Sequence, residues 1–193
     1  MKAVAFNGSP RKEGNTETLL RRVLGEIEAA GIEAELIHIA GEPLRGCTAC
    51  MQCRKRMDKR CAIDTDKMND YLAKAFEADI VVLGSPTYFA DVSAEMKALI
   101  DRLGFVSMAN GRLLQNKIGA AVVAVRRGGG VHVFDSMNHL FHISGMFIVG
   151  STYWNLGYGL GKREVEDDEE GMNNMTDLGK RIAWLAAKIV GEE

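Results

Sequence analysis

The fold of this chain is decided by a stretch near its start that reads Phe6-Asn7-Gly8-Ser9-Pro10-Arg11-Lys12-Glu13-Gly14-Asn15-Thr16. The residues before it, Ala3 to Phe6, form a short apolar run that is typical of a fully buried parallel strand. After it, apolar residues recur at helical spacing up to a stop at Gly31, namely Leu19, Leu20, Val23, Leu24 and Ile27. The stretch therefore predicts a loop that leads from a buried strand directly into a helix.

A loop of this kind attracts anions. Unpaired backbone N–H groups and the positive end of the helix dipole point into it. Ser9, Asn15 and Thr16 add hydroxyl and amide donors, and Arg11 adds a planar cation suited to phosphate oxygens. Strand-to-helix turns also collect Gly, Ser and Asn for capping alone. We interpret the loop as a phosphate-binding loop because so many phosphate-compatible residue types occur together in it.

The form of the phosphate compound follows from what the loop lacks. It has no Gly-Lys-Ser/Thr ending, and its two glycines do not fit the dinucleotide fingerprint, so a single phosphomonoester fits better. Gly8-Ser9-Pro10-Arg11 followed by Gly14-Asn15-Thr16 resembles the FMN phosphate loop of the flavodoxin-like, NAD(P)H-dependent FMN reductase family. The resemblance implies that Ser9, Arg11, Asn15 and Thr16 bind the phosphate of FMN.

Composition sets the limits of the interpretation. At 193 residues and 47% hydrophobic content, the chain is long enough for one well-buried core, and we expect a single FMN-binding domain over residues 1–193. A net charge of -2 gives no general attraction to nucleic acid or anionic membranes. The longest apolar run, 120–125, is too short to span a bilayer, and we expect a soluble, cytoplasmic protein.

Strand and helix patterns alternate along the rest of the chain. Further strands are predicted over 34–39, 80–83, 118–125 and 147–149, and further helices over 66–77, 93–102, 133–144 and 174–190. The stretch 151–173, which includes an acidic run, reads as irregular. The alternation predicts an α/β fold with a doubly wound five-stranded parallel sheet in three layers. The family resemblance implies the flavodoxin-like strand order 2-1-3-4-5, with the ligand beyond the carboxyl end of the first strand.

A second motif follows the predicted third strand and reads Gly84-Ser85-Pro86-Thr87-Tyr88-Phe89-Ala90. A flat ring system needs polar groups at its edge and apolar surface at its face, and this loop offers both. Together with the ending Lys97-Ala98-Leu99-Ile100-Asp101-Arg102, the block resembles the isoalloxazine loop and the following helix of the same family. The resemblance implies that Pro86, Thr87, Tyr88 and Phe89 hold the flavin ring.

A third loop, Arg126-Arg127-Gly128-Gly129-Gly130, follows the predicted fourth strand. Its glycines allow the backbone to approach a ligand, and a guanidinium nearby could stabilise negative charge on reduced flavin. Arg127, Gly129 and Gly130 fit the spacing of the family, and the resemblance implies that Arg127 and Gly129 close the third side of the pocket. Val131 and His132 depart from the family's polar continuation. The other interpretation is a glycine turn with exposed arginines.

All four cysteines lie in a Cys-rich segment at about 44–64, with the spacing Cys47, Cys50, Cys53 and Cys61. Thiolates spaced this tightly can ligate one iron-sulfur cluster. The pattern resembles the ligand motif of iron-sulfur flavoproteins, a branch of the same family that carries a 4Fe-4S cluster beside FMN. A zinc site, free thiols and a redox disulfide are the alternatives. The surrounding Lys and Arg residues could offset an anionic cluster or form a solvated basic loop.

These patterns predict an oxidoreductase in which NAD(P)H reduces bound FMN and reduced FMN passes electrons to an acceptor. No catalytic side chain is needed, because flavin N5 carries the chemistry. One alternative is an electron carrier without NAD(P)H turnover that receives electrons from ferredoxin or another electron-transfer partner at the Cys-rich segment, and another is a thiol-based redox sensor. The family resemblance also implies a homodimer or homotetramer, with Tyr153 and Trp154 as candidate interface residues.

Overall fold

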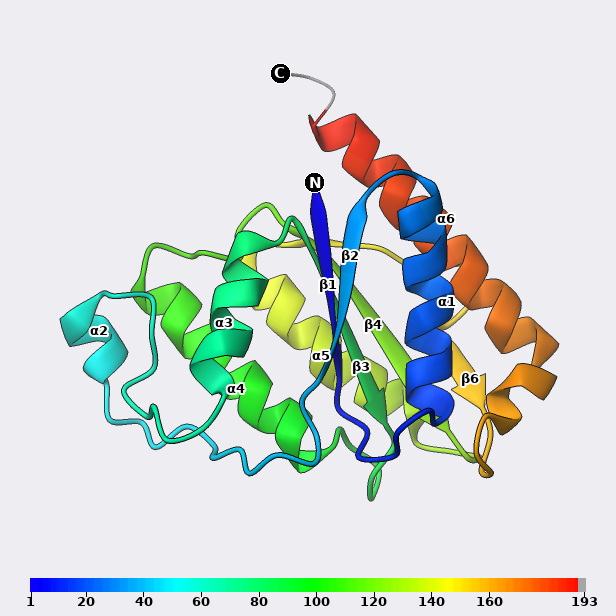
Figure 1. Ribbon diagram of the computed structural model, residues 1–193, viewed down its shortest axis with the longest axis horizontal. Helices are drawn as coiled ribbons and strands as arrows, with labels where there is room; N and C mark the ends of the chain where they lie inside the picture. The colour runs from blue at the N-terminus through cyan, green and yellow to red at the C-terminus, as the bar shows by residue number, and fades with distance from the viewer. Residues whose placement is uncertain (191–193) are drawn as a thin grey trace.

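The computed structural model describes residues 1–190, and it contains a parallel sheet with the strand order β2-β1-β3-β4-β5 (Figure 1). The strands are β1 Lys2–Asn7, β2 Glu33–His38, β3 Ile80–Pro86, β4 Ile118–Val125, β5 Phe147–Ile148 and β6 Leu156–Tyr158. The helices are α1 Asn15–Ala29, α2 Gln52–Arg56, α3 Met68–Glu77, α4 Ala94–Ala109, α5 Gly130–Ser144 and α6 Glu169–Val190, with a 3-10 turn η1 at Glu164–Asp167. The predicted fold class and strand order are confirmed, while residues 191–193 of the predicted domain lie outside the described residues.

Helices cover both faces of the sheet and give three layers. Side chains alternate across a strand, so Val4 and Phe6 of β1 face one side and Ala3 and Ala5 face the other. The first set packs with residues of α3, α4 and α5, and the second packs with α1 and α6. Figure 1 shows α2 beyond this sandwich, at the far end from α6. β4 is buried along its whole length, as expected of a central strand covered on both faces.

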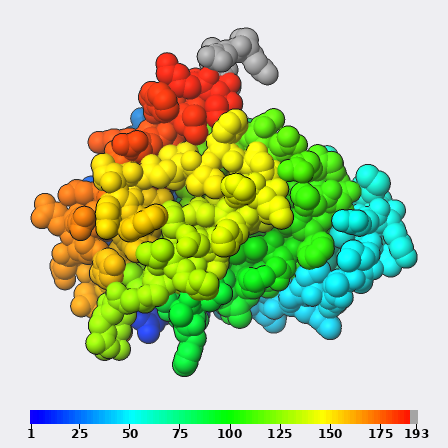
Figure 2. Space-filling model, turned by 180° about the vertical axis from the view of Figure 1, so that it is seen from behind, coloured from blue at the N-terminus to red at the C-terminus, as the bar shows by residue number. Residues whose placement is uncertain are grey.

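The fifth strand position is divided between two short strands, which corrects the prediction of a five-stranded sheet. β5 pairs with the start of β4, and β6 pairs in parallel with its end. Between them, the buried Asn155 donates from Nδ2 to the Ala121 carbonyl (3.0 Å), while its own carbonyl accepts from the Val123 amide. Figure 2 shows this part of the chain, in yellow, along the face opposite to that of Figure 1. The stretch 151–173, predicted to be irregular, therefore contains a strand.

Several element boundaries also differ from the prediction. α5 begins at Gly130, three residues early, because Gly129 takes a left-handed conformation at its N-cap. α4 continues to Ala109, and α6 begins at Glu169, so the acidic run forms η1 and the first turn of α6 rather than a loop. Acidic residues suit this position because they face the positive end of a helix dipole. Within residues 1–190, no helix is long and apolar enough to cross a membrane.

Candidate functional site

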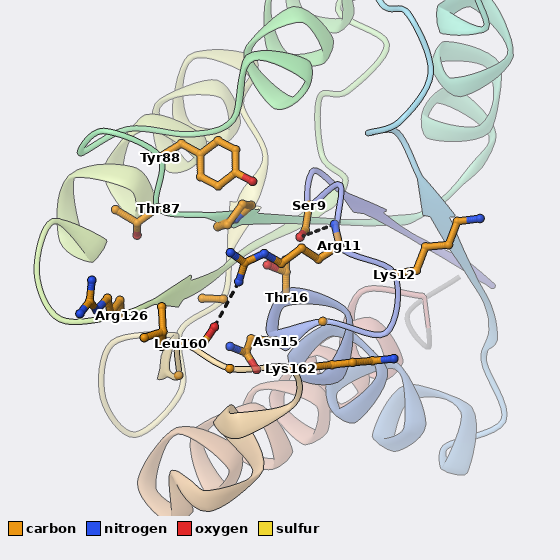
Figure 3. A pocket seen from close by; sticks show the side chains of 15 residues that line it. Ser9, Arg11, Lys12, Asn15, Thr16, Thr87, Tyr88, Arg126, Leu160 and Lys162 are labelled. Atoms are coloured by element: carbon orange, nitrogen blue, oxygen red, sulfur yellow. Dashed lines mark hydrogen bonds between the residues drawn. The ribbon is translucent and has the colours of Figure 1, made fainter.

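A cavity of about 540 Å³ lies at the carboxyl ends of β1, β3, β4 and β6. The residues that line it are Ser9, Arg11, Lys12, Gly14, Asn15, Thr16, Pro86, Thr87, Tyr88, Ala124, Arg126, Gly159, Leu160, Gly161 and Lys162 (Figure 3). It lies where the strand order reverses beside β1, which is where doubly wound sheets bind ligands. The lining carries four cationic side chains and no acidic one, so the cavity is suited to an anion.

The loop between β1 and α1, residues 8–14, is held in shape by side chains. The Ser9 amide donates to Asn7 Oδ1 (2.9 Å), and the Arg11 amide donates to Ser9 Oγ (3.3 Å). α1 begins at Asn15. The first backbone hydrogen bond of this helix is the one that the Thr18 amide donates to Gly14 O. The amides of Asn15 and Thr16 precede that bond and face the loop end of the helix. The predicted phosphate residues Ser9, Arg11, Asn15 and Thr16 are thus brought together.

A polar cluster lies beneath this loop. Glu17 is buried and accepts hydrogen bonds from the Glu13 amide (2.7 Å) and from Arg21 Nε (2.8 Å). His38 Nε2 lies 3.4 Å from Glu17 Oε2, and His38 Nδ1 lies 3.2 Å from Asn7 Nδ2. Burial acts to raise the pKa of Glu17, but the hydrogen bonds from Arg21 and Glu13 act against it, so the pKa lies below the usual value. Both ends of the loop are therefore tied to one buried carboxylate.

The lowered pKa of Glu17 leads to a prediction on stability. A carboxyl group whose pKa is depressed by folding stabilises the protein above its unfolded pKa of about 4.3, and this contribution is lost as the pH falls through the folded pKa. The free energy of unfolding of wild type should exceed that of Glu17→Gln at pH 6, and the difference should shrink below about pH 4.3. Urea denaturation at several pH values measures it, with Glu28→Gln on the exposed face of the same helix as control. A difference that stays constant between pH 6 and 3 would contradict the prediction.

The opposite wall of the cavity is formed by Pro86, Thr87 and Tyr88 at the end of β3. The amides of Thr87 and Tyr88 are already used, since they donate to Ala124 O (2.9 Å) and Asp91 O (2.8 Å). Thr87 Oγ1 is buried, and among the described residues it has no hydrogen-bond partner. Such a group is costly unless a ligand or water satisfies it. Thr87, a lining residue of this wall, therefore carries a buried hydroxyl without a partner among the described residues.

Phe89 does not line the cavity. It belongs to a two-residue turn closed by reciprocal backbone hydrogen bonds between Tyr88 and Asp91, and its side chain is fully exposed. Phe89 and Ala90 both have positive φ, +43° and +67°, which is the conformation of a type I′ turn. In Figures 1 and 2 the turn projects from the lower edge of the molecule. A predicted ring-binding residue is thus placed outside the pocket wall by a hairpin that the loop sequence does not signal.

The turn should be stabilised by a glycine. Ala90→Gly removes a Cβ from a left-handed residue at the cost of extra freedom in the unfolded chain, so we expect the free energy of unfolding to rise by about 0.5–1 kcal/mol. Chemical denaturation measures it. The matched control is Ala73→Gly on the exposed side of α3, where the same change should destabilise by about 0.5–1 kcal/mol. Equal destabilisation by both changes would show that the Phe89-Ala90 turn carries no strain.

On the third side of the cavity lies a different arginine from the one that the sequence predicted. Arg126 lines the cavity, whereas Arg127 and Gly129 are not among the lining residues. Gly129 instead takes the left-handed conformation at the start of α5, where an added Cβ would lie 3.4 Å from Thr87 Cγ2. Gly129 therefore suits this position through its positive φ of +85°, which residues other than glycine rarely adopt, and it packs against Thr87 without forming part of the lining.

Sequence reasoning missed the loop between β6 and η1, residues 159–163. Arg11 Nη1 donates to Leu160 O (3.1 Å) across the cavity, as Figure 3 shows, and Lys162 pairs with Glu13 (2.6 Å). Asn15 turns its Oδ1 toward the Val165 amide (3.2 Å), so its side chain supports this loop. The sequence signal was weak, because the Gly-rich run 157–161 reads as an irregular turn. The loop forms a fourth wall of the cavity.

The Cys-rich segment lies apart from this cavity. Cys47, Cys50, Cys53 and Cys61 all line one small hollow of about 20 Å³, which α4 closes with Arg102, Phe105 and Val106. No three His, Cys, Asp or Glu side chains of residues 1–190 are placed as ligands of one metal ion. Hydrogen bonding from the backbone of Gln52 holds the pKa of the exposed Cys50 below its usual value. The structure thus gathers the predicted thiols around one point without arranging them as a finished metal site.

The strand order, the helices on both faces and the ligand-sized cavity at the switch point define a flavodoxin-like α/β protein. Residues 1–161 match the family model described as NADPH-dependent FMN reductase, and the chain belongs to this family. An iron-sulfur flavoprotein of Methanocaldococcus jannaschii is 37% identical over 98% of this chain and 99% of its own length. An iron-sulfur flavoprotein of Methanosarcina thermophila is 33% identical over 94% and 93% of the two chains. The predicted family is confirmed.

Solved structures agree on the fold. An archaeal flavodoxin superposes with a TM-score of 0.63 at 18% identity, covering 96% of this chain and 98% of its own. An NADH:FMN oxidoreductase superposes with a TM-score of 0.69 at 16% identity, covering 95% and 89%. These identities support a shared fold and carry no information on substrates.

Proposed function

We propose that the cavity binds FMN, with its phosphate at the β1–α1 loop and its ring against the Pro86–Tyr88 wall. The observation that carries the proposal is the pairing, across one cavity, of a helix N-terminus and Arg11 on one side with the unpaired Thr87 Oγ1 on the other. A phosphomonoester is stabilised by backbone N–H groups at a helix N-terminus. The cavity volume of about 540 Å³ lies in the range of small-molecule sites.

The reaction that we propose is hydride transfer from NAD(P)H to FMN, followed by electron transfer to an acceptor. Bound FMN supplies both one- and two-electron chemistry. Thr16 and the α1 amides would bind the phosphate, Thr87 would donate to the polar edge of the ring, and Tyr88 would cover part of its face. Arg126, at the end of β4, stabilises negative charge near the ring. No side chain has to act as acid or base in the hydride step.

We further propose that the Cys-rich segment holds a 4Fe-4S cluster. Four thiols around one hollow are the donor set that such a cluster needs, and the names of the relatives support it. The hollow is small and the thiols are not yet arranged as ligands, so the thiol side chains must rearrange when a cluster is built in. Zinc, a redox disulfide and free thiols remain the competing interpretations of the same four residues.

The alternative function is electron transfer without NAD(P)H turnover. The names of the relatives favour it, because they describe iron-sulfur flavoproteins rather than reductases. Basic residues beside the cysteines, such as Arg54 and Lys55 of α2, suit an acidic electron-transfer partner such as ferredoxin. Steady NAD(P)H oxidation by the purified protein supports the reductase, whereas turnover only with a reduced partner supports the carrier.

One experiment tests both cofactors. An absorbance spectrum with iron and sulfide analysis on anaerobically purified protein should show flavin bands and about four iron atoms per chain. Flavin without iron would overturn the cluster and leave the FMN site standing. Neither chromophore, even after FMN and iron are added, would overturn the whole proposal.

We also propose that the chain acts as a single cytoplasmic domain that assembles as a homodimer or homotetramer. Tyr153 and Trp154 are exposed, and Trp154 packs edge-on against Phe134 with ring centroids 5.8 Å apart. Exposed aromatic clusters of this kind are typical of interfaces. Light scattering of the purified protein, compared with Trp154→Ser, measures the assembly.

A further inference from the structure

We propose that Arg102 is the positioning residue of the Cys-rich segment and that it supplies a hydrogen bond to the sulfur of Cys61. Arg102 lies in the middle of α4, and its side chain is completely buried. A buried guanidinium needs hydrogen-bond acceptors for its N–H groups, so the acceptors around Arg102 show which parts of the chain it holds in place. Only the expected effect of Arg102 on the reduction potential depends on the proposed cluster; its positioning role does not.

The partners of Arg102 come from both ends of the Cys-rich segment. Its Nη1 donates to the Arg45 carbonyl (3.1 Å) and to Asp66 Oδ2 (2.5 Å), and its Nη2 donates to the Ile63 carbonyl (2.7 Å). The Arg45 amide donates in turn to the same Asp66 oxygen (3.0 Å). One guanidinium therefore joins Arg45, two residues before the first cysteine, to Ile63 and Asp66, which follow the last cysteine.

Arg102 also donates from Nε to Cys61 Sγ at 3.2 Å. Cys61 is also held through its backbone, because its amide donates to Asn69 Oδ1 (2.8 Å) and its carbonyl accepts from Asn69 Nδ2 (3.1 Å). Asn69 is itself buried on α3. Cys61 is thus fixed at its amide, its carbonyl and its sulfur, whereas Cys50 is exposed.

Little else holds the segment to the sheet. Its only regular element is the five-residue α2, whose residues are not buried, and several of its residues take left-handed backbone conformations, among them Ala49, Met51 and Met57. Leu44, Cys53 and Cys61 pack against the core only in part. In place of an apolar core, the segment uses polar side chains of the neighbouring helices: Arg102 of α4, Asn69 of α3, and Asn110 at the C-cap of α4, which accepts from the Lys59 amide (2.9 Å).

This arrangement makes the four thiols differ in how firmly they are held and in the hydrogen bonds that their sulfur atoms accept. A hydrogen bond to a cluster sulfur lowers its electron density and favours the reduced state, so the potential of a cluster depends on such donors. We infer that Cys61 is the fixed ligand, because its sulfur accepts the one hydrogen bond from a guanidinium to a cysteine sulfur among the described residues, and that the other three thiols assemble around it.

The experiment compares Arg102→Lys with wild type, because lysine keeps the charge but cannot reach four acceptors in fork geometry. In metal-free protein, amide hydrogen exchange in residues 44–66 should accelerate at least tenfold, while exchange in β1 and β4 stays unchanged. Arg56→Lys, which alters an exposed arginine of the same segment paired with Asp58, is the matched control and should leave exchange as in wild type. Unchanged exchange in Arg102→Lys would overturn the positioning role.

A second variant guards against failure to fold. Arg102→Met combined with Asp66→Asn removes both buried charges, so the core should fold while exchange in 44–66 remains fast.

With iron and sulfide restored, the reduction potential of the cluster in Arg102→Lys should fall below that of wild type, and an unchanged potential would overturn the hydrogen bond to Cys61. If wild type takes up no iron, the proposed cluster fails, and the exchange measurement still decides the role of Arg102.

Discussion

Replacing Arg11 and Thr16 together by alanine is expected to weaken FMN binding by about 10²- to 10⁴-fold, because two charge-assisted hydrogen bonds to phosphate are each worth about 1.5–3 kcal/mol. Both residues line the cavity beside the α1 N-terminus, and Thr16 is almost completely buried. In the structure Arg11 reaches Leu160 O, so binding requires its guanidinium to turn or share its donors. Fluorescence titration with FMN and with riboflavin measures the loss.

The comparison with riboflavin shows whether the loss of affinity arises at the phosphate of FMN. Riboflavin has no phosphate, so its affinity should be nearly equal in wild type and in the double variant. The matched control is Thr18→Ala with Arg22→Ala, which removes the same residue types from α1 outside the cavity lining. Undiminished FMN affinity in Arg11→Ala/Thr16→Ala would show that the phosphate binds elsewhere.

Asp66→Ala is expected to lower the free energy of unfolding by about 3–5 kcal/mol, because it leaves the charge of Arg102 buried without its counter-ion. Asp66 is 4% exposed and Arg102 is 0% exposed in their side chains, and the two are 2.5 Å apart. Although burial acts to raise the pKa of Asp66, hydrogen bonds from Arg102 and from the Arg45 and Met68 amides keep it below the usual value. The carboxylate is therefore charged at neutral pH.

Urea denaturation followed by circular dichroism measures this loss. The matched control is Asp101→Ala, one residue before Arg102 on the same helix, which breaks a solvent-exposed pair with Lys97. That change should cost only about 0.3–0.5 kcal/mol. Equal effects of the two substitutions would mean that water solvates the guanidinium of Arg102, contrary to its burial.

Local patterns made much of the fold predictable. The β1–α1 loop and the alternation of elements predicted the α/β class, and the buried β4 was delimited correctly as 118–125. β6 escaped because its three residues include a glycine, Gly157, and have no periodicity of their own. An added Cβ at Gly157 would lie 2.6 Å from Leu19, so this glycine marks the close packing of β6 on α1.

The site was less predictable because it depends on contacts between distant residues. Arg126 and Arg127 are adjacent, and only the end of β4 decides which of them lines the cavity. Arg102 reads as a surface charge by residue type. A signal was present, since it lies three residues from Leu99 and one from Leu103 on the buried side of α4. Its counter-ion Asp66 lies far back in the sequence, and no local rule pairs the two.

The meeting of Arg45 and Asp66 at one guanidinium also bears on how such a chain evolves. Both ends of the Cys-rich segment come together at a single side chain outside the sheet. The residues between them can therefore be lengthened, exchanged or deleted without a change in the strand order. After such a deletion, a short linker is enough to join Arg45 to Asp66, because the entropic cost of a loop grows slowly with its length. A lineage could therefore gain or lose cysteine chemistry by local insertion while its flavin pocket is inherited intact.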